Sequence, residues 1–285
     1  MKNNFRQTAL FAESSCMKAN RTVVKRIAKL GLLLMMGMSM NADAGLFGSG
    51  GTSWKEEVLL HDGQKIMVER TQLLEGRHEI GQGPPIKEHS ITFTPPGANK
   101  AITWKDEFSA DIGHANFTLL ALHILNGVPY IVTTPDLCLA YNKWGRPNPP
   151  YVFFKYDGRA WQRIQLPEFP ATFKNINLII NTYREGEIKE HEHKTRSGFV
   201  SAQDVKEINS SLTQPEYKSI LREPIKQGTD GSSVNCMEEV RTRDGWLSLD
   251  WFSDQPSYES CLKFCERKGV SPQNCPCKTL FKGAK

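Results

Sequence analysis

Apolar and β-branched residues form short runs between residues 54 and 182, and turn-forming pairs separate these runs. Asp62-Gly63, Asn126-Gly127 and Asp157-Gly158 each lie between two such runs, a pattern typical of β-hairpins with two-residue turns. The pattern predicts a mainly antiparallel β domain over residues 54–182. Successive hairpins are compatible with a sandwich, a barrel or a partial propeller-like meander.

Pro95-Pro96-Gly97 marks a fourth hairpin, which is expected to join residues 90–94 to residues 101–104. Pro129 lies inside the strand expected after Asn126-Gly127. In a two-residue hairpin, Ile124 faces Pro129 in a pair without hydrogen bonds, so the missing N–H points away from the partner strand. The strand is therefore expected to be an edge, or to be bulged, at that end.

The pattern changes after the β domain. Residues 183–198 are rich in charge and poor in apolar residues, which predicts a linker, and residues 199–285 are expected to be helical. Ser201 and Asp204 form a capping box for one helix, and Pro215 can open a second. Asp254 is expected to cap a later helix that ends near Gly269. The predicted fold class is therefore α+β.

Residues 1–44 have the three parts of a cleavable export signal. Lys25, Arg26 and Lys29 precede an apolar run at 30–40, and Ala42-Asp43-Ala44 predicts cleavage before Gly45. The run is shorter than the ~18 residues that a membrane span needs; the alternatives are an uncleaved anchor or a buried helix. Met17 is a second candidate start, and residues 45–53 are expected to form a flexible leader. We expect a periplasmic protein, or one secreted to the medium.

Cleavage of this signal changes the charge balance. The chain has 36 Lys and Arg and 31 Asp and Glu residues, of which residues 1–44 hold seven and two, so 29 of each sign remain. A neutral mature chain gives no electrostatic reason to expect nucleic-acid binding. No membrane span is expected after cleavage.

Six cysteines remain after cleavage, and an even number in an exported chain favours disulfides. Cys261 and Cys265 lie one turn apart on a predicted helix, and Cys275 and Cys277 lie on one side of an extended segment. An antiparallel return predicts the pairs Cys265–Cys275 and Cys261–Cys277. The remaining Cys138 and Cys236 would then join the two halves of the chain. The alternative is a four-thiolate zinc site, although C-x2-C spacing is absent.

No strong catalytic motif and no cofactor signature is found in the sequence. If the segment around residue 192 is extended, His191 and His193 point to one side and can share a metal ion; the alternative is a solvated charged loop. His78, with Glu79 or Asp106 nearby, can act as an acid–base pair, but ordinary loop salt bridges explain these residues better.

Residues 141–151 form a proline-rich loop with aromatic residues at its rim. Tyr141, Trp144, Arg146 and Tyr151 are candidate binding residues, because Trp, Tyr and Arg often anchor interfaces and prolines limit the loss of backbone freedom on binding. The alternative is that Trp144 and Tyr151 close one end of the β core while the prolines shape the connection.

The segments WKEEVLLHDGQKI, GRHEIGQGPPIKEHSITF and CLAYNKWGRPNPPYVFFKYDG resemble a group of uncharacterised exported proteobacterial proteins. The resemblance implies an exported single-copy module and supplies no catalytic residue, substrate or fold. The sequence favours a non-enzymatic binding or envelope-associated protein whose partner is an envelope protein or polymer. The alternative is a periplasmic hydrolase-like or metal-dependent enzyme that uses His78 or His191 and His193.

Overall fold

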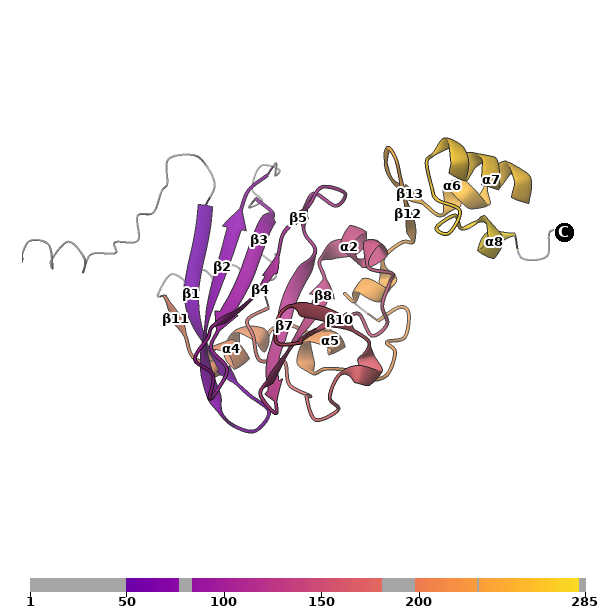
Figure 1. Ribbon diagram of the computed structural model, residues 1–285. Helices are drawn as coiled ribbons and strands as arrows, with labels where there is room; N and C mark the ends of the chain where they lie inside the picture. Colours follow the sequence, from indigo (N-terminus) through magenta and orange to yellow (C-terminus); the bar gives the residue numbers. More distant parts are fainter. Residues whose placement is uncertain (1–49, 77–83, 181–197, 230, 282–285) are drawn as a thin grey trace, which may run out of the picture. The chain divides into compact units, whose positions relative to one another are not determined.

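The computed structural model describes residues 50–76, 84–180, 198–229 and 231–281 (Figure 1). All of them belong to one compact unit, Gly48–Lys285. Two open sheets form its centre, and neighbouring strands are antiparallel except for one parallel pair, β1 and β11. The first sheet has the order β11 (Phe199–Val200), β1 (Gly50–Leu59), β2 (Lys65–Leu74), β3 (Ile86–Phe93), β4 (Ile102–Asp106). The second has the order β10 (Trp161–Ile164), β9 (Val152–Tyr156), β8 (Val128–Pro135), β7 (Phe117–Leu125).

One apolar core lies between the two sheets, as in a β-sandwich. Val58, Ile91 and Trp104 of the first sheet share it with Leu122 and Ile131 of the second, and all five side chains are buried. In β2 the buried positions alternate with exposed ones, because side chains point to opposite faces along a strand. The predicted α+β class with mainly antiparallel sheets is confirmed, and the described sheets form a sandwich rather than a closed barrel.

A second apolar core covers the outer face of β7–β9. Tyr130 and Phe153 of the sheet pack there against Phe169, Phe173 and Leu212 from the following chain. Two short helices, η1 (Leu166–Glu168) and α5 (Pro215–Lys218), contribute to this covering layer, whereas α4 (Ala202–Asn209) packs against Trp54 of β1. The second sheet is therefore buried on both faces, which explains why β7 and β8 are apolar almost throughout.

The hairpins follow the predicted order, but only one has the predicted turn. Asn126 and Gly127 have positive φ values of 51° and 76° between the paired residues Leu125 and Val128, as in a two-residue type I′ turn. At Asp62-Gly63, the Leu60 N–H donates to Gln64 O, so the loop has three residues. The side chain of Asp157 accepts hydrogen bonds from two following N–H groups and makes that connection longer as well.

The two proline-containing segments behave as expected. Phe93 pairs with Ile102 across the Pro95-Pro96-Gly97 turn, which confirms the fourth hairpin. Pro129 faces Ile124 in β7, and the ladder between β8 and β9 begins only at Tyr130. The strand is an edge at Pro129, so no sheet hydrogen bond is lost there.

A buried ion pair lies on the inner face of the first sheet. Arg70 Nη1 donates to Glu56 Oε2 at 3.1 Å, and Glu56 also accepts hydrogen bonds from the Trp54 indole (3.0 Å) and the Ile179 N–H (2.7 Å). Burial lowers the pKa of Arg70, and the Glu56 carboxylate opposes this change. The network joins the sheet to the chain that follows the second sheet.

The capping box at Ser201 and Asp204 is confirmed at the start of α4, and Pro215 begins α5. The later part of the chain is less helical than expected. It contains η2 (Ser233–Asn235), β12 (Glu239–Thr242), β13 (Gly245–Ser248), α6 (Asp250–Ser253), α7 (Tyr258–Arg267) and α8 (Cys277–Leu280). Ser257 rather than Asp254 caps α7, and Gly269 follows its end with φ of 69°, as expected for a residue just after a helix.

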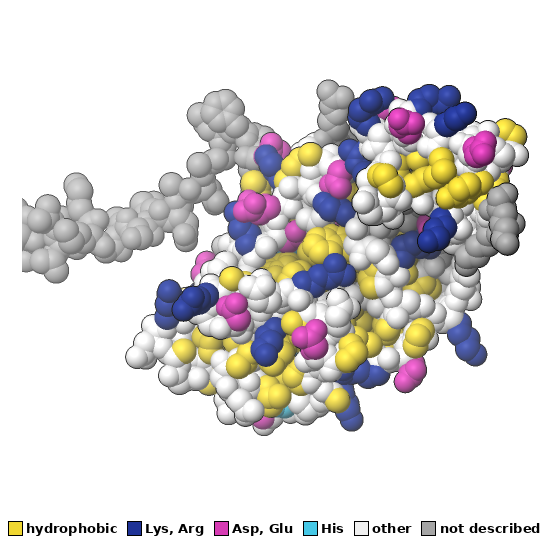
Figure 2. Space-filling model, turned by 45° about the vertical axis from the view of Figure 1, so that its right-hand side comes forward, with side chains coloured by type: hydrophobic (Ala, Val, Ile, Leu, Met, Phe, Trp, Pro, Cys, Tyr) yellow, Lys and Arg dark blue, Asp and Glu magenta, His cyan; other side chains and the backbone are white. Residues whose placement is uncertain are grey.

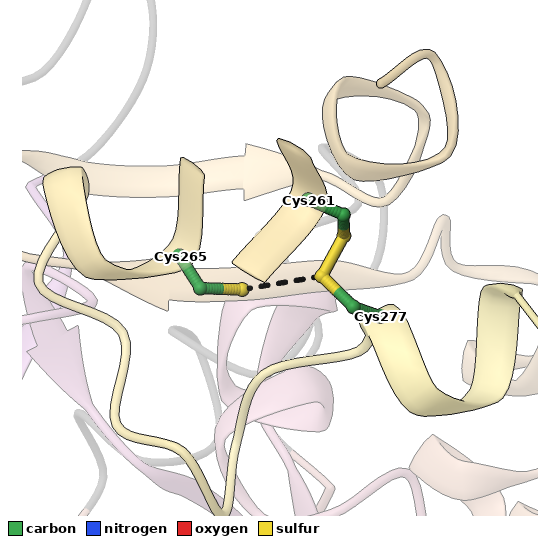
Figure 3. Close-up of side chains that lie close together, drawn as sticks. All are labelled: Cys261, Cys265 and Cys277. Carbon is green, nitrogen blue, oxygen red and sulfur yellow. Dashed lines mark hydrogen bonds between the residues drawn. A yellow bond between two sulfur atoms is a disulfide. The ribbon is translucent and has the colours of Figure 1, made fainter. Parts of the chain in front are cut away.

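The C-terminal module, defined here as residues 237–281, is held by two disulfides, Cys261–Cys277 and Cys265–Cys275. The Cys265 sulfur lies 3.6 Å from the Cys277 sulfur of the other disulfide (Figure 3). All three predicted pairs are formed, including Cys138–Cys236. The expectation of an extended Cys275-Pro276-Cys277 segment was wrong, because α8 begins at Cys277.

Candidate functional site

The structure places two of the four predicted binding residues inside the protein. Tyr141 and Tyr151 are 2% and 3% exposed, and the Tyr151 hydroxyl donates to the carbonyl oxygens of Glu216 and Ser219. Burial raises the pKa of both phenols. The rings of these two candidate binding residues are therefore part of the core.

Trp144 packs against the β core. Its ring centroid lies 4.5 Å from that of Phe117, and its indole N–H donates to Asn116 Oδ1 at 3.2 Å. The Arg163 guanidinium lies over the ring, 5.2 Å from its centre. The side chain is half-buried, so it fills the margin of the sandwich core as the alternative interpretation held.

Arg146 ties the same loop to the start of the C-terminal module. Its guanidinium donates to Asn142 Oδ1 at 2.8 Å, to Cys236 O at 2.7 Å and to Met237 O at 3.1 Å. The Cys138–Cys236 disulfide makes a covalent link beside these hydrogen bonds. Asn142, on α2 (Leu137–Lys143), accepts a further hydrogen bond from the Glu239 N–H. The hydrogen-bonding capacity of the Arg146 guanidinium is thus largely taken up by contacts within the protein.

These links form one side of a cleft of about 640 Å³. The end of α2 and the loop after it form one wall, and the first residues of β12 lie opposite. The rest of the lining comes from Asp111, Glu238, Trp246, Leu249, residues 273–276, Thr279 and Leu280. The volume lies within the range of about 300–1,000 Å³ that is usual for small-ligand sites. Three segments far apart in the sequence therefore build one concave surface.

The walls of the cleft carry charges of both signs. Lys143 Nζ lies 2.9 Å from Asp111 Oδ1, which also accepts a hydrogen bond from the Ser109 hydroxyl. Partial burial opposes ionisation of Asp111, but the hydrogen bonds from Ser109 and Lys143 outweigh it and hold its pKa below the usual range. Glu238 and Arg241 are exposed at the opposite wall. On the face shown in Figure 2, basic and acidic side chains are similarly interspersed.

The residues proposed for catalysis and metal binding are only partly described. His78, Glu79, His191 and His193 lie outside the described residues. Asp106 is buried, where it lies 3.3 Å from His89 and accepts hydrogen bonds from the side chain of Asn116 and the main chain of Phe117. Those partners connect β3, β4 and β7, so the contacts of Asp106 are structural.

The described part of the chain brings three candidate metal ligands together at one place only, at Cys261, Cys265 and Cys277. All three sulfurs belong to disulfides, which removes the thiolates that a zinc site requires. The four-thiolate alternative is therefore not supported.

Sequence reasoning missed a buried acid–histidine pair, Asp136 and His114. Asp136 Oδ2 lies 3.4 Å from His114 Nδ1, and Thr118 donates to Asp136 Oδ1 at 3.3 Å. Burial raises the pKa of Asp136, and the neighbouring His114 opposes this change. The carboxyl borders a second hollow of about 590 Å³ beside Cys138 and Cys236. No local motif signals the pair, because strand pairing brings together residues 22 positions apart.

His123 is a further buried titratable residue, away from the cleft. Its Nε2–H donates to Asn175 O at 2.9 Å, and its ring stacks on Phe173 with centroids 4.6 Å apart. Burial lowers the pKa of His123 to about 4. The imidazole is therefore neutral near pH 7 and acts as a core side chain.

No protein-family model matches the chain, and comparisons with curated proteins and with solved structures give no significant match. Within the described residues, every helix is too short or too polar to cross a bilayer. The geometry of the cleft is therefore the main basis for a functional proposal.

Proposed function

We propose that this protein is an exported, non-enzymatic binding protein of the bacterial periplasm that holds its ligand in the cleft between the α2 loop and the C-terminal module. One observation carries the proposal: the cleft has a ligand-sized volume and walls fixed in place by a disulfide and by the Arg146 hydrogen bonds. Walls that are fixed before binding lower the entropic cost of holding a ligand.

Two further features support export to the periplasm. Residues 1–44 have the pattern of a cleavable signal, and three disulfides are formed by the six cysteines that follow it. Disulfides persist in oxidising compartments such as the periplasm. Intact-mass analysis of the fractionated protein should find a chain that begins at Gly45, and a cytoplasmic full-length chain would contradict export.

Site-specific photocrosslinking tests the cleft directly. A photoreactive benzoylphenylalanine is placed at Thr279, which is exposed in the cleft, in cells that produce the protein. The matched control carries the same group at Glu69, which is exposed on the outer face of the first sheet. Specific adducts from Thr279 and none from Glu69 would support the proposal that the cleft holds the ligand. Equal adducts from both positions, or none from Thr279, contradict the proposal.

A further inference from the structure

The Cys138–Cys236 disulfide differs from the other two in its access to solvent. Cys138 is exposed and Cys236 is half-buried, and both line the hollow of about 590 Å³. In the C-terminal module, by contrast, Cys261, Cys265 and Cys277 are at most 3% exposed, so each disulfide there has a buried cysteine. Exchange requires that a thiol reaches the bond, and exposed disulfides are the more easily reduced ones. An attacking thiol therefore has the best access at Cys138–Cys236.

This disulfide also holds one wall of the cleft in place. Of the three disulfides, it alone joins α2 to the residue directly before the C-terminal module. The module has an apolar core of its own around Phe252, and no apolar cluster of the described residues spans module and sandwich. Hydrogen bonds cross instead, from the Glu239 N–H to Asn142 Oδ1 and from Trp246 Nε1 to Asp111 O. Each of these adds only modestly to stability in water, so the wall depends on the disulfide.

We propose that the Cys138–Cys236 disulfide is a redox clasp: thiol–disulfide exchange with an external dithiol opens it, frees the β12 wall of the cleft and so releases the ligand. This inference rests on the proposed function of the cleft. Both folded parts should survive the opening, because the two apolar cores of the sandwich contain no cysteine and the module keeps its own two disulfides. Opening the clasp therefore moves one wall and leaves the fold in place.

The exchange takes place in two steps, each an attack of one sulfur on another. A thiolate of the dithiol attacks Cys138 Sγ, the S–S bond breaks, and its electron pair leaves on Cys236 Sγ, which takes up a proton. The second thiolate of the dithiol then attacks the first sulfur of the same molecule. The electron pair of the mixed disulfide leaves on Cys138 Sγ, which is protonated in turn. The dithiol is thereby oxidised to a disulfide by two electrons, and Cys138–Cys236 is reduced to two thiols.

The first test measures the exchange on the intact mature chain, with dithiothreitol as the dithiol. Samples are quenched with acid at intervals, unfolded and alkylated, and peptide mapping by mass spectrometry gives the rate for each disulfide. Cys138 and Cys236 should be reduced at least about tenfold faster than the four cysteines of the C-terminal module. Equal rates for all three disulfides, or faster reduction within the module, would overturn the clasp.

Hydrogen exchange followed by NMR tests whether the opened clasp frees the wall. After selective reduction, the Glu239 N–H should exchange at least about tenfold faster, because its hydrogen bond to Asn142 crosses the cleft. The Arg243 N–H is the matched control, since it donates to Lys268 O within the module and should change by less than about twofold. An unchanged rate at Glu239 would overturn the clasp. Equal acceleration at Arg243 would also overturn it, because the module would then unfold as a whole.

The last test connects the clasp to the ligand and separates this inference from the proposed function. Benzoylphenylalanine at Thr279 is combined with Cys138→Ser and Cys236→Ser, in cells that hold equal amounts of variant and unaltered chain. Specific adducts that are lost only in the cysteine variant support the clasp. Equal adducts in both would overturn the clasp and leave the proposed function standing, whereas no adduct in either would overturn both. The two measurements on the intact chain do not depend on the folding of this variant.

Discussion

Truncation of Trp144 decides whether its indole stabilises the fold or anchors a ligand. The Trp144→Ala change removes the contact with Phe117, the hydrogen bond to Asn116 and the interaction with Arg163. A Trp→Ala change in a full core costs about 3–5 kcal/mol. Because part of the Trp144 surface meets solvent, we expect a loss of about 2–3 kcal/mol in the free energy of unfolding.

The components of this loss are consistent with that range. An aromatic pair contributes about 0.5–1.5 kcal/mol beyond its buried area, a neutral hydrogen bond about 1 kcal/mol, and an exposed cation–π contact about 0.5–1 kcal/mol. Trp144→Phe keeps an aromatic ring against Phe117 and removes the N–H donor, so it should lose only about 1 kcal/mol.

Urea unfolding of the mature chain, followed by far-UV circular dichroism, measures these differences. Trp251→Ala is the matched control, because Trp251 is 59% exposed on α6 and its truncation should stay within about 0.5 kcal/mol of the unaltered chain. The reasoning is refuted if Trp144→Ala is as stable as Trp251→Ala. The prediction that Trp144 is a binding residue would then be favoured.

Three further changes test what holds the fold together. Arg70→Met should cost about 3–5 kcal/mol by urea unfolding, because it leaves the Glu56 carboxylate buried without its cation, and adding Glu56→Gln should recover part of this loss. The pKa of His123, about 4 in the folded chain, lies below its usual value near 6.5, so unfolding stability should fall from about pH 6.5 to pH 4 by up to about 3 kcal/mol; a slope unchanged in His123→Gln would contradict this. Replacing Cys138 and Cys236 by Ser should lower stability by about 4–5 kcal/mol, as expected for a loop of 98 residues, and unchanged thermal melts would contradict it.

The parts of the fold that could be predicted from the sequence depend on local rules. Asn126-Gly127 gives the predicted turn because both residues tolerate positive φ, whereas Asp62-Gly63 and Asp157-Gly158 mark their hairpins and leave the loop length open. The β12–β13 hairpin was missed because its turn residues, Arg243-Asp244, are not a typical hairpin pair. The pair Asp244-Gly245 was a usable signal, but it lies in a segment that was assigned to helices.

The disulfide pairs show a correct prediction with a partly wrong reason. The i, i+4 spacing of Cys261 and Cys265 puts both on one face of α7, and this fixed the order of pairing. Cys275 and Cys277 reach them through the start of a short helix and not through an extended strand. The constraint came from one helix face, so the conformation of the partner segment had little influence on the pairing.

The candidate site could not be predicted in the same way, because its residues meet only through tertiary contacts. The proline-rich loop pointed to the correct part of the molecule, yet its aromatic rings turn to the core and its Lys143 and Arg146 reach the cleft. Aromatic composition alone does not separate an anchor from a core residue, since both uses bury the ring. The opposite wall comes from β12, almost a hundred residues later, and is brought there by Cys138–Cys236. A cleft assembled in this way depends on that disulfide. Reduction of Cys138–Cys236 should therefore abolish ligand binding in the cleft at concentrations of reductant that leave the sandwich folded.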